Sequence, residues 1–132
     1  MTSETKATTV SRTAFWAGWV LSVLPSLLLF FSGAMKLLKP EDVLKGFEHL
    51  GYPEQLAVPL GVVEIGCTLI YLIPRTAVLG AILLTGYLGG AVATHARLME
   101  PQFAAPTILG MLVWGGLFLR DPRIREVILN RR

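Results

Sequence analysis

One carboxylate in this chain, Glu64, lies near the middle of an apolar run that extends over residues 56–73. An ionisable side chain in the hydrocarbon of a membrane costs at least about 2.5 to 3.5 kcal/mol on insertion scales, so it normally faces the interior of a helix bundle and is paired. The ends of the neighbouring apolar runs supply the candidate partners. We therefore predict one polar cluster, which consists of Lys36, Glu64, Thr94, His95 and Arg97.

Depth and helical phase decide which of these groups can pair with Glu64. In alternating helices, Lys36 and Arg97 reach the same membrane face, and Glu64 lies about 12 Å in from that face at 1.5 Å per residue. A long lysine or arginine side chain bridges most of this distance. His95 is rotated by roughly 200° from Arg97 on its helix. Lys36 and Arg97 are therefore the preferred ion-pair partners, and His95 is the weaker one.

The composition indicates that the elements holding these residues are membrane helices. Hydrophobic residues make up 53% of the chain, charged residues only 16%, and the mean hydropathy is +0.59, whereas soluble domains carry about 25% charged residues. Four apolar segments approach the ~20 residues that cross a bilayer, and only helices satisfy the backbone there. They cover residues 14–38, 56–73, 76–94 and 106–119, with the last one starting near Phe103.

The loop between the first two segments has the features of a helix of its own. Pro40, Glu41 and Asp42 are typical of a first helical turn, apolar residues follow at helical spacing, and Gly51 is a natural stop. The predicted fold is therefore all-α, a four-helix transmembrane bundle with a short interfacial amphipathic helix between spans 1 and 2.

Counting lysine and arginine in the short flanks predicts the orientation. The two termini and the loop at Arg75 together hold 8 positive residues, and the other side holds 4. Because cytoplasmic flanks carry the excess, we expect both termini in the cytoplasm. Residues 1–13 then form a cytoplasmic N-terminal segment, residues 14–119 the membrane domain and residues 120–132 a basic cytoplasmic tail.

Several classes of protein do not fit. The first apolar segment is longer than the roughly 7 to 15 residues of a signal-peptide core. A single cysteine, Cys67, excludes an internal disulfide and a CxxC pair. The two histidines fall in different loops, so we expect no metal site. We expect no cofactor either. The positive-inside bias explains the basic residues, so nucleic-acid binding is not expected.

Small and polar residues recur on one face of each of the first three spans. Such stripes face the bundle interior, where glycines let backbones approach closely, and they also leave room for a ligand beside Glu64. Packing alone is the simpler interpretation of the glycines. The candidate ligand-binding residues are Ser32, Thr68, Tyr71, Tyr87 and Gly90.

Four blocks of the sequence, in order and spacing, are similar to a known family. They are Ser32-Gly33-Ala34-Met35-Lys36-Leu37, Leu50-Gly51-Tyr52-Pro53, Gly61-Val62-Val63-Glu64-Ile65-Gly66 and Ile73-Pro74-Arg75-Thr76, the last leading into residues 86–97. Over residues 28–114 the chain resembles DoxX-like membrane proteins. The resemblance implies a bacterial inner-membrane, multi-pass protein. The family takes its name from a subunit linked to thiosulfate oxidation with quinone, and some members are associated with oxidative-stress or membrane redox complexes.

Three functions remain open at the level of sequence. The first is a non-catalytic subunit or scaffold, with the bilayer, other membrane subunits or a second copy of the chain as partners. The second is a binder of quinone or another lipophilic molecule in a cavity in the outer half. The third is an acid-base enzyme that acts on such a molecule, with Glu64 as base and His95 or Lys36 as acid.

Overall fold

The computed structural model describes residues 11–129 as a helical bundle without strands in that part of the chain. Within residues 11–129 the α-helices are α2 (Arg12–Leu38), α3 (Glu41–Leu50), α4 (Ala57–Leu72), α5 (Ala77–Arg97), α6 (Ala104–Arg120) and α7 (Pro122–Leu129). Short 3-10 helices, η1 (Glu54–Leu56), η2 (Pro74–Thr76) and η3 (Pro101–Phe103), lead into α4, α5 and α6. The prediction of an all-α fold is therefore confirmed.

Four helical segments are long and apolar enough to cross a membrane, namely 12–38, 54–72, 74–97 and 101–120. Their outward side chains are large and apolar: Phe31 is 67% exposed and Met111 is 68% exposed. In water such a surface would be an extensive apolar patch. In a bilayer it is the lipid-facing side, so the chain is a multi-pass membrane protein.

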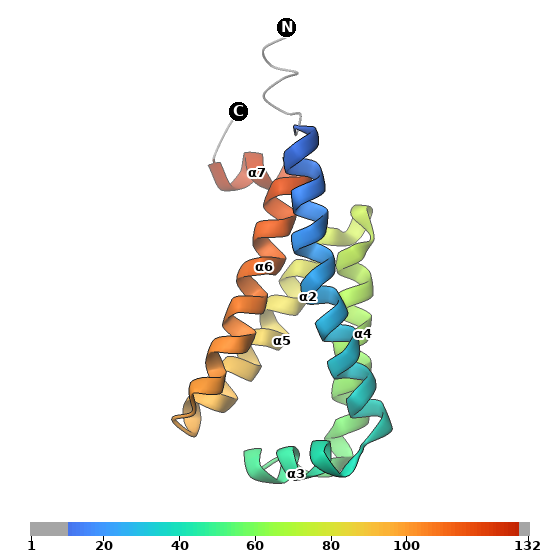
Figure 1. Ribbon diagram of the computed structural model, residues 1–132, viewed down its shortest axis with the longest axis vertical. Coiled ribbons are helices and arrows are strands. Elements are labelled where there is room, and N and C mark those ends of the chain that lie inside the picture. The colour runs from blue at the N-terminus through green and yellow to red at the C-terminus, as the bar shows by residue number, and fades with distance from the viewer. Residues whose placement is uncertain (1–10, 130–132) are drawn as a thin grey trace, which may run out of the picture.

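The four spans pack closely at one end and diverge toward the other, as Figure 1 shows. We call these the α7 end and the α3 end, after the short helices found there. Glycine permits the close packing at the α7 end, because a Cβ atom on Gly18 of α2 would lie 2.7 Å from the carbonyl oxygen of Gly116 in α6. No larger residue fits between these two backbones.

The bundle interior near the α7 end is filled by side chains. Tyr71, Leu84 and Leu117 have no exposed surface. The Tyr71 hydroxyl lies within hydrogen-bonding distance of two groups, the carbonyl oxygen of Val113 at 2.6 Å and the hydroxyl of Ser22 at 2.9 Å. This part of the bundle interior is therefore filled and rigid, and the larger open space lies at the α3 end.

Helix α3 crosses the open end of the bundle (Figure 1). Its first turn carries Glu41 and Asp42, and Gly51 ends it in a left-handed conformation with φ of 81°. Phe47 is its one buried residue. The predicted interfacial helix between the first two spans is therefore present, and it lies over the bundle interior.

Part of the predicted basic tail, residues 120–132, is helical and packs against the bundle. Arg120 is the last residue of α6 and is buried, and Pro122–Leu129 form helix α7. The burial of Ile124 against the bundle explains this helix. Most of the predicted N-terminal segment, residues 1–10, and the last three residues of the tail lie outside the described residues.

Candidate functional site

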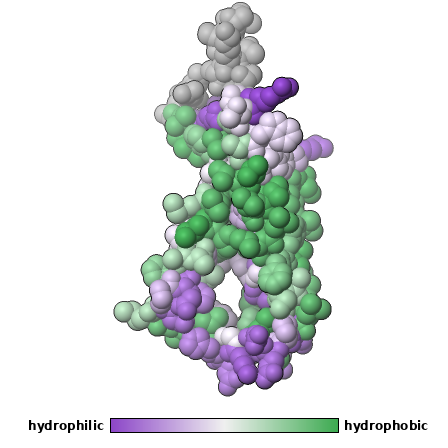
Figure 2. Space-filling view, in the orientation of Figure 1, coloured by the Kyte–Doolittle hydropathy of each residue, from purple (hydrophilic) through white to green (hydrophobic). Residues whose placement is uncertain are grey.

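The divergence of the spans leaves a cavity of about 590 Å³ at the α3 end. All four spans line it, and α3 and the segment that follows it close the end of the bundle. Figure 2 shows the surface hollowed through at this end, with apolar residues above the opening and polar residues below it. The lining includes Leu28, Leu29, Phe47, Leu60, Leu88, Pro106 and Leu109. The cavity is thus mainly apolar.

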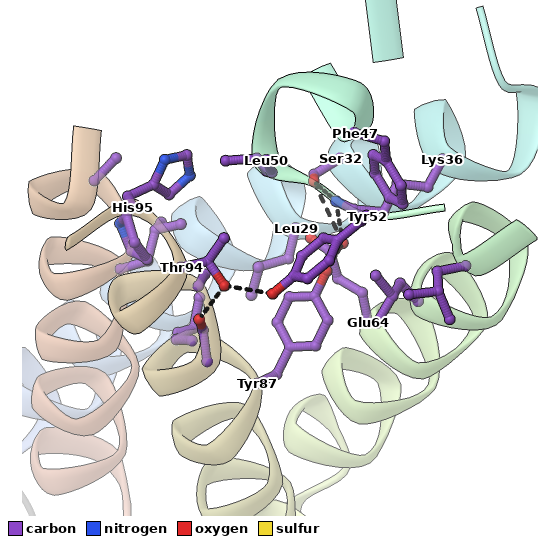
Figure 3. Close-up of a pocket in the computed structure, with 18 of the residues that line it drawn as sticks. Leu29, Ser32, Lys36, Phe47, Leu50, Tyr52, Glu64, Tyr87, Thr94 and His95 are labelled. Carbon is purple, nitrogen blue, oxygen red and sulfur yellow. Dashed lines mark hydrogen bonds and ion pairs between the residues drawn. The ribbon is translucent and has the colours of Figure 1, made fainter. Parts of the chain in front are cut away.

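Glu64 forms the polar centre of this cavity (Figure 3). One of its carboxylate oxygens, Oε1, accepts hydrogen bonds from the Lys36 ammonium at 2.9 Å, the Tyr87 hydroxyl at 2.8 Å and the Ser32 hydroxyl at 3.3 Å. The other oxygen, Oε2, has no hydrogen-bond partner within residues 11–129. Oε1 therefore has all the hydrogen bonds it can accept, and Oε2 is free to accept one from a ligand.

Close packing of α2 on α4 brings Lys36 to Glu64. Gly33 lies three residues before Lys36, and Gly61 lies three residues before Glu64. A Cβ atom on Gly61 would lie 2.8 Å from the carbonyl oxygen of Gly33. Glycine therefore lets the two backbones meet about one turn from each charged residue, which leaves the Lys36 and Glu64 side chains within 2.9 Å of each other.

A second polar group lies closer to α3. The Tyr52 hydroxyl and the Thr94 hydroxyl are 2.6 Å apart, and the Thr94 hydroxyl donates to the carbonyl oxygen of Gly90 at 2.8 Å. Tyr52 is therefore the donor in its bond to Thr94. This bond ties the segment after α3 to α5, and Figure 3 shows both side chains beside the cavity.

Two further contacts hold α3 over the bundle. Arg97 donates to the carbonyl oxygen of Leu50 at 2.6 Å. The imidazole of His49 lies 3.0 Å from one carboxylate oxygen of Glu100, and the imidazole of His95 lies 3.7 Å from the other. Both histidines of the chain thus converge on one carboxylate at the rim of the cavity.

The structure separates the predicted polar cluster into these groups. Lys36 and Glu64 form an ion pair, and Thr94 and His95 line the same cavity. Arg97 differs from the expectation, because its guanidinium bonds to the carbonyl group at the end of α3 and it does not line the cavity. The presence of a helix over the bundle, rather than an open end, gives Arg97 this partner.

The predicted ligand-binding residues divide in a similar way. Ser32, Tyr87 and Gly90 line the cavity. Thr68 does not, because its hydroxyl donates to the carbonyl oxygen of Glu64 within α4. Tyr71 does not either, because it belongs to the filled part of the bundle near the α7 end.

Sequence reasoning did not select three lining residues of the loop, Phe47, Leu50 and Tyr52. The helical spacing of Phe47 and Leu50 indicated an amphipathic face, but it did not indicate what that face covers. Tyr52 follows the glycine that ends α3, where the chain turns back toward the bundle. A tyrosine directly after a helix-ending glycine was the sequence feature that could have indicated a side chain turned toward the bundle.

This arrangement can hold a largely apolar molecule and orient its polar end. The described residues contain no group of three or more histidine, cysteine, aspartate or glutamate side chains that could hold a metal ion. The available chemistry is therefore hydrogen bonding and charge, supplied by Glu64, Lys36 and the hydroxyl groups around them.

One of the comparisons with known proteins gives a match. No curated protein and no solved structure matches the chain. The model of the DoxX-like family matches residues 20–116, which include all of α3, α4 and α5 and most of α2 and α6. Because this match covers well over half of the chain and includes every lining residue of the cavity, the protein belongs to the DoxX-like family of membrane proteins.

Proposed function

We propose that this DoxX-like protein binds a lipophilic small molecule, such as a quinone or another lipid-soluble compound, in the cavity beside Glu64. The supporting observation is the combination of about 590 Å³ of space, an apolar lining and a few convergent polar groups. Ligand sites typically have 300 to 1,000 Å³ and this same chemistry. A cavity of this size at the centre of a bundle is also larger than packing defects in protein interiors.

The position of the polar groups suggests how the ligand is oriented. Its polar end would lie against Glu64, Lys36 and Tyr87, where both donors and an acceptor are present. Its apolar part would extend along Leu28 and Leu109 toward the opening between the diverging spans. The bilayer can supply and receive such a molecule sideways through this opening.

A non-catalytic subunit or scaffold of a membrane redox complex is the alternative function. The Lys36–Glu64 ion pair favours it, because a paired charge in the membrane fixes the register of α2 against α4. Such a role would require no ligand. An acid-base enzyme would instead require Glu64 to take a proton from the bound molecule, which adds a chemical step to the binding function.

We also propose that the protein resides in a bacterial inner membrane with the α7 end in the cytoplasm. The excess of arginine and lysine at that end supports this orientation. In a Cys67→Ser background, a cysteine placed at residue 132 should react with a membrane-impermeant thiol reagent only after the cells are opened. Labelling of this position in intact spheroplasts would reverse the orientation.

Gly90 allows a direct test of the binding function. It lines the cavity, and a Cβ atom at this position would have no neighbour within 4 Å. Gly90→Leu should therefore fill the cavity without disturbing the backbone. Gly89→Leu is the matched control, because Gly89 also has open space around its Cβ position but does not line the cavity.

Mass spectrometry of organic extracts from gently purified protein measures the retained lipophile. We expect it in the wild type and in Gly89→Leu, and at least about tenfold less in Gly90→Leu, since a side chain of this size occupies the binding volume. Both variants should unfold at similar temperatures. Absence of any retained lipophile in the wild type, or equal retention in both variants, would leave the scaffold function as the better explanation.

A further inference from the structure

A second, smaller cavity of about 300 Å³ lies at the α7 end, remote from Glu64. Its walls combine aromatic rings of α2 with charged residues at the junction of α6 and α7. It is lined by Phe15, Trp19, Pro74, Arg120, Asp121 and Arg123. Aromatic and basic residues together are typical of the level at which lipid headgroups meet a membrane protein.

Arg120 is a buried cation without a carboxylate partner. It is 6% exposed, and none of the salt bridges formed by the described residues involves it. Its guanidinium donates to the Ser22 hydroxyl and to the carbonyl oxygen of Tyr71, and it lies 4.2 Å from the centre of the Trp19 ring. These neutral contacts position the group but give its charge no salt-bridge partner, and buried charges are normally paired.

The neighbouring charges leave the cavity positive. Asp121 is paired with Arg123, whose guanidinium donates to both carboxylate oxygens at 3.1 Å and 2.8 Å. Burial raises the pKa of Asp121, but the hydrogen bonds and charge of Arg123 and the charge of Arg120 outweigh it, so this pKa lies below its ordinary value. Asp121 is therefore ionised at pH 7, and Arg120, Arg123 and Asp121 together contribute one net positive charge.

We infer that this cavity binds the phosphate group of an anionic phospholipid, with Arg120 and Arg123 as the charged contacts and Phe15 and Trp19 beside the upper acyl chain. One net positive charge complements the single negative charge of a phosphatidylglycerol headgroup. The aromatic wall is open to the bilayer side, since Phe15 is 41% exposed. Basic pockets between membrane helices bind lipid headgroups in this manner.

Two variants change the charge of the cavity in opposite directions, and a third is a control. Arg123→Gln lowers its net charge from +1 to 0, and Asp121→Asn raises it from +1 to +2. Asp121 and Arg123 lie at the junction of α6 and α7 and at the start of α7. Asparagine at position 121 keeps an acceptor for the backbone N–H of Arg123, which bonds to Asp121 at 2.9 Å. Arg75→Gln is the matched control, because it removes a positive charge at the same end of the bundle from a residue that does not line the cavity.

Native mass spectrometry in a neutral detergent, with phosphatidylglycerol added stepwise, measures Kd for each variant. We expect phosphatidylglycerol to bind more tightly than phosphatidylcholine. Arg123→Gln should weaken the binding roughly fivefold and Asp121→Asn should strengthen it roughly fivefold, which is the factor for about 1 kcal/mol per charge. Arg75→Gln should change Kd less than about twofold, because its exposed side chain does not line the cavity and charges surrounded by water are screened.

Four results would overturn the inference. Equal effects of Arg75→Gln and Arg123→Gln would indicate attraction by the overall charge of this end. Weaker binding to Asp121→Asn would show that Asp121 and Arg123 act only as a structural pair. Equal binding of phosphatidylcholine would remove the requirement for an anionic lipid. Competition by inorganic phosphate at equal concentration would assign the site to free phosphate, and this arm does not depend on either arginine variant folding.

Discussion

The ion pair between Lys36 and Glu64 makes the most demanding prediction about stability. The Glu64 side chain is 2% exposed and the Lys36 side chain is 18% exposed. Removing one partner of a buried pair costs about 3 to 5 kcal/mol, because the other charge is left without compensation. The two single variants, Lys36→Met and Glu64→Gln, should nevertheless differ in stability, since only the lysine side chain can reach water when its partner is removed.

Lys36→Met should lower the free energy of unfolding by about 3 kcal/mol. The Glu64 carboxylate is then held only by the neutral donors Ser32 and Tyr87, and it cannot move toward water from the middle of α4. Glu64→Gln should cost less, about 1 to 2 kcal/mol. Lys36 lies in the last turn of α2, already donates to the Ser32 hydroxyl at 2.7 Å, and can extend toward the interface.

The double variant should be less destabilised than the sum of the two single variants, with a coupling energy of about 2 kcal/mol. Unfolding by sodium dodecyl sulfate in mixed micelles, followed by far-ultraviolet circular dichroism, gives the four free energies of the cycle. Arg97→Met combined with Glu64→Gln is the control cycle, because Arg97 bonds to the carbonyl oxygen of Leu50 instead.

The reasoning is refuted in either of two cases. In the first, Lys36 and Glu64 variants are additive within about 0.5 kcal/mol, which is the scatter of independent sites. In the second, Arg97 couples to Glu64 as strongly as Lys36 does. A larger loss for Glu64→Gln than for Lys36→Met would contradict the argument that Lys36 alone can reach the interface.

Three further predictions concern packing, the α3 helix and acid. Gly80→Ala should lower stability by about 2 kcal/mol, because its Cβ would overlap the backbone of Tyr71, whereas Gly89→Ala, with open space, should not; thermal unfolding compares them. Tyr52→Phe, which removes one hydrogen bond worth about 1 kcal/mol, should speed amide hydrogen exchange in α3. The pKa of Asp121 is lower in the folded protein than its ordinary value of 3.8, so the ionised carboxylate stabilises the fold at pH values above 3.8. This stabilisation is lost as the pH falls through the folded pKa. Asp121→Asn should therefore flatten the decline in unfolding temperature below about pH 4.

Local sequence patterns predicted the spans and the interfacial helix because each is determined by residues close together in the chain. The apolar segment expected at 76–94 became α5 (Ala77–Arg97), and the glycine expected to end the loop helix does so with φ of 81°. The fourth span, expected to end at residue 119, ends one residue later at Arg120. Arg120 was assigned to the tail by its charge, but its hydrogen bonds to Ser22 and Tyr71 keep it inside α6.

The candidate site was partly predictable for the same reason. The helical period places Lys36 and Glu64 on inward faces of their helices, and the structure places them 2.9 Å apart. Arg97 could not be assigned in this way, since its partner is a backbone carbonyl oxygen, that of Leu50, and only the tertiary structure places the end of α3 beside Arg97. Tyr71 shares a face with Glu64 on α4, but the two residues lie in different halves of the bundle, one filled and one open.

The sequence by itself therefore determined that the chain is a four-span membrane protein with a carboxylate inside it, because hydropathy, helical period and helix-stop residues act locally. Only the tertiary structure decided that the spans diverge and leave a cavity. That divergence depends on the close approach of backbones at Gly18 and Gly116, together with the side chains that fill the α7 end. These contacts join residues almost a hundred positions apart, and neither their formation nor the space they leave at the other end is encoded in any single segment.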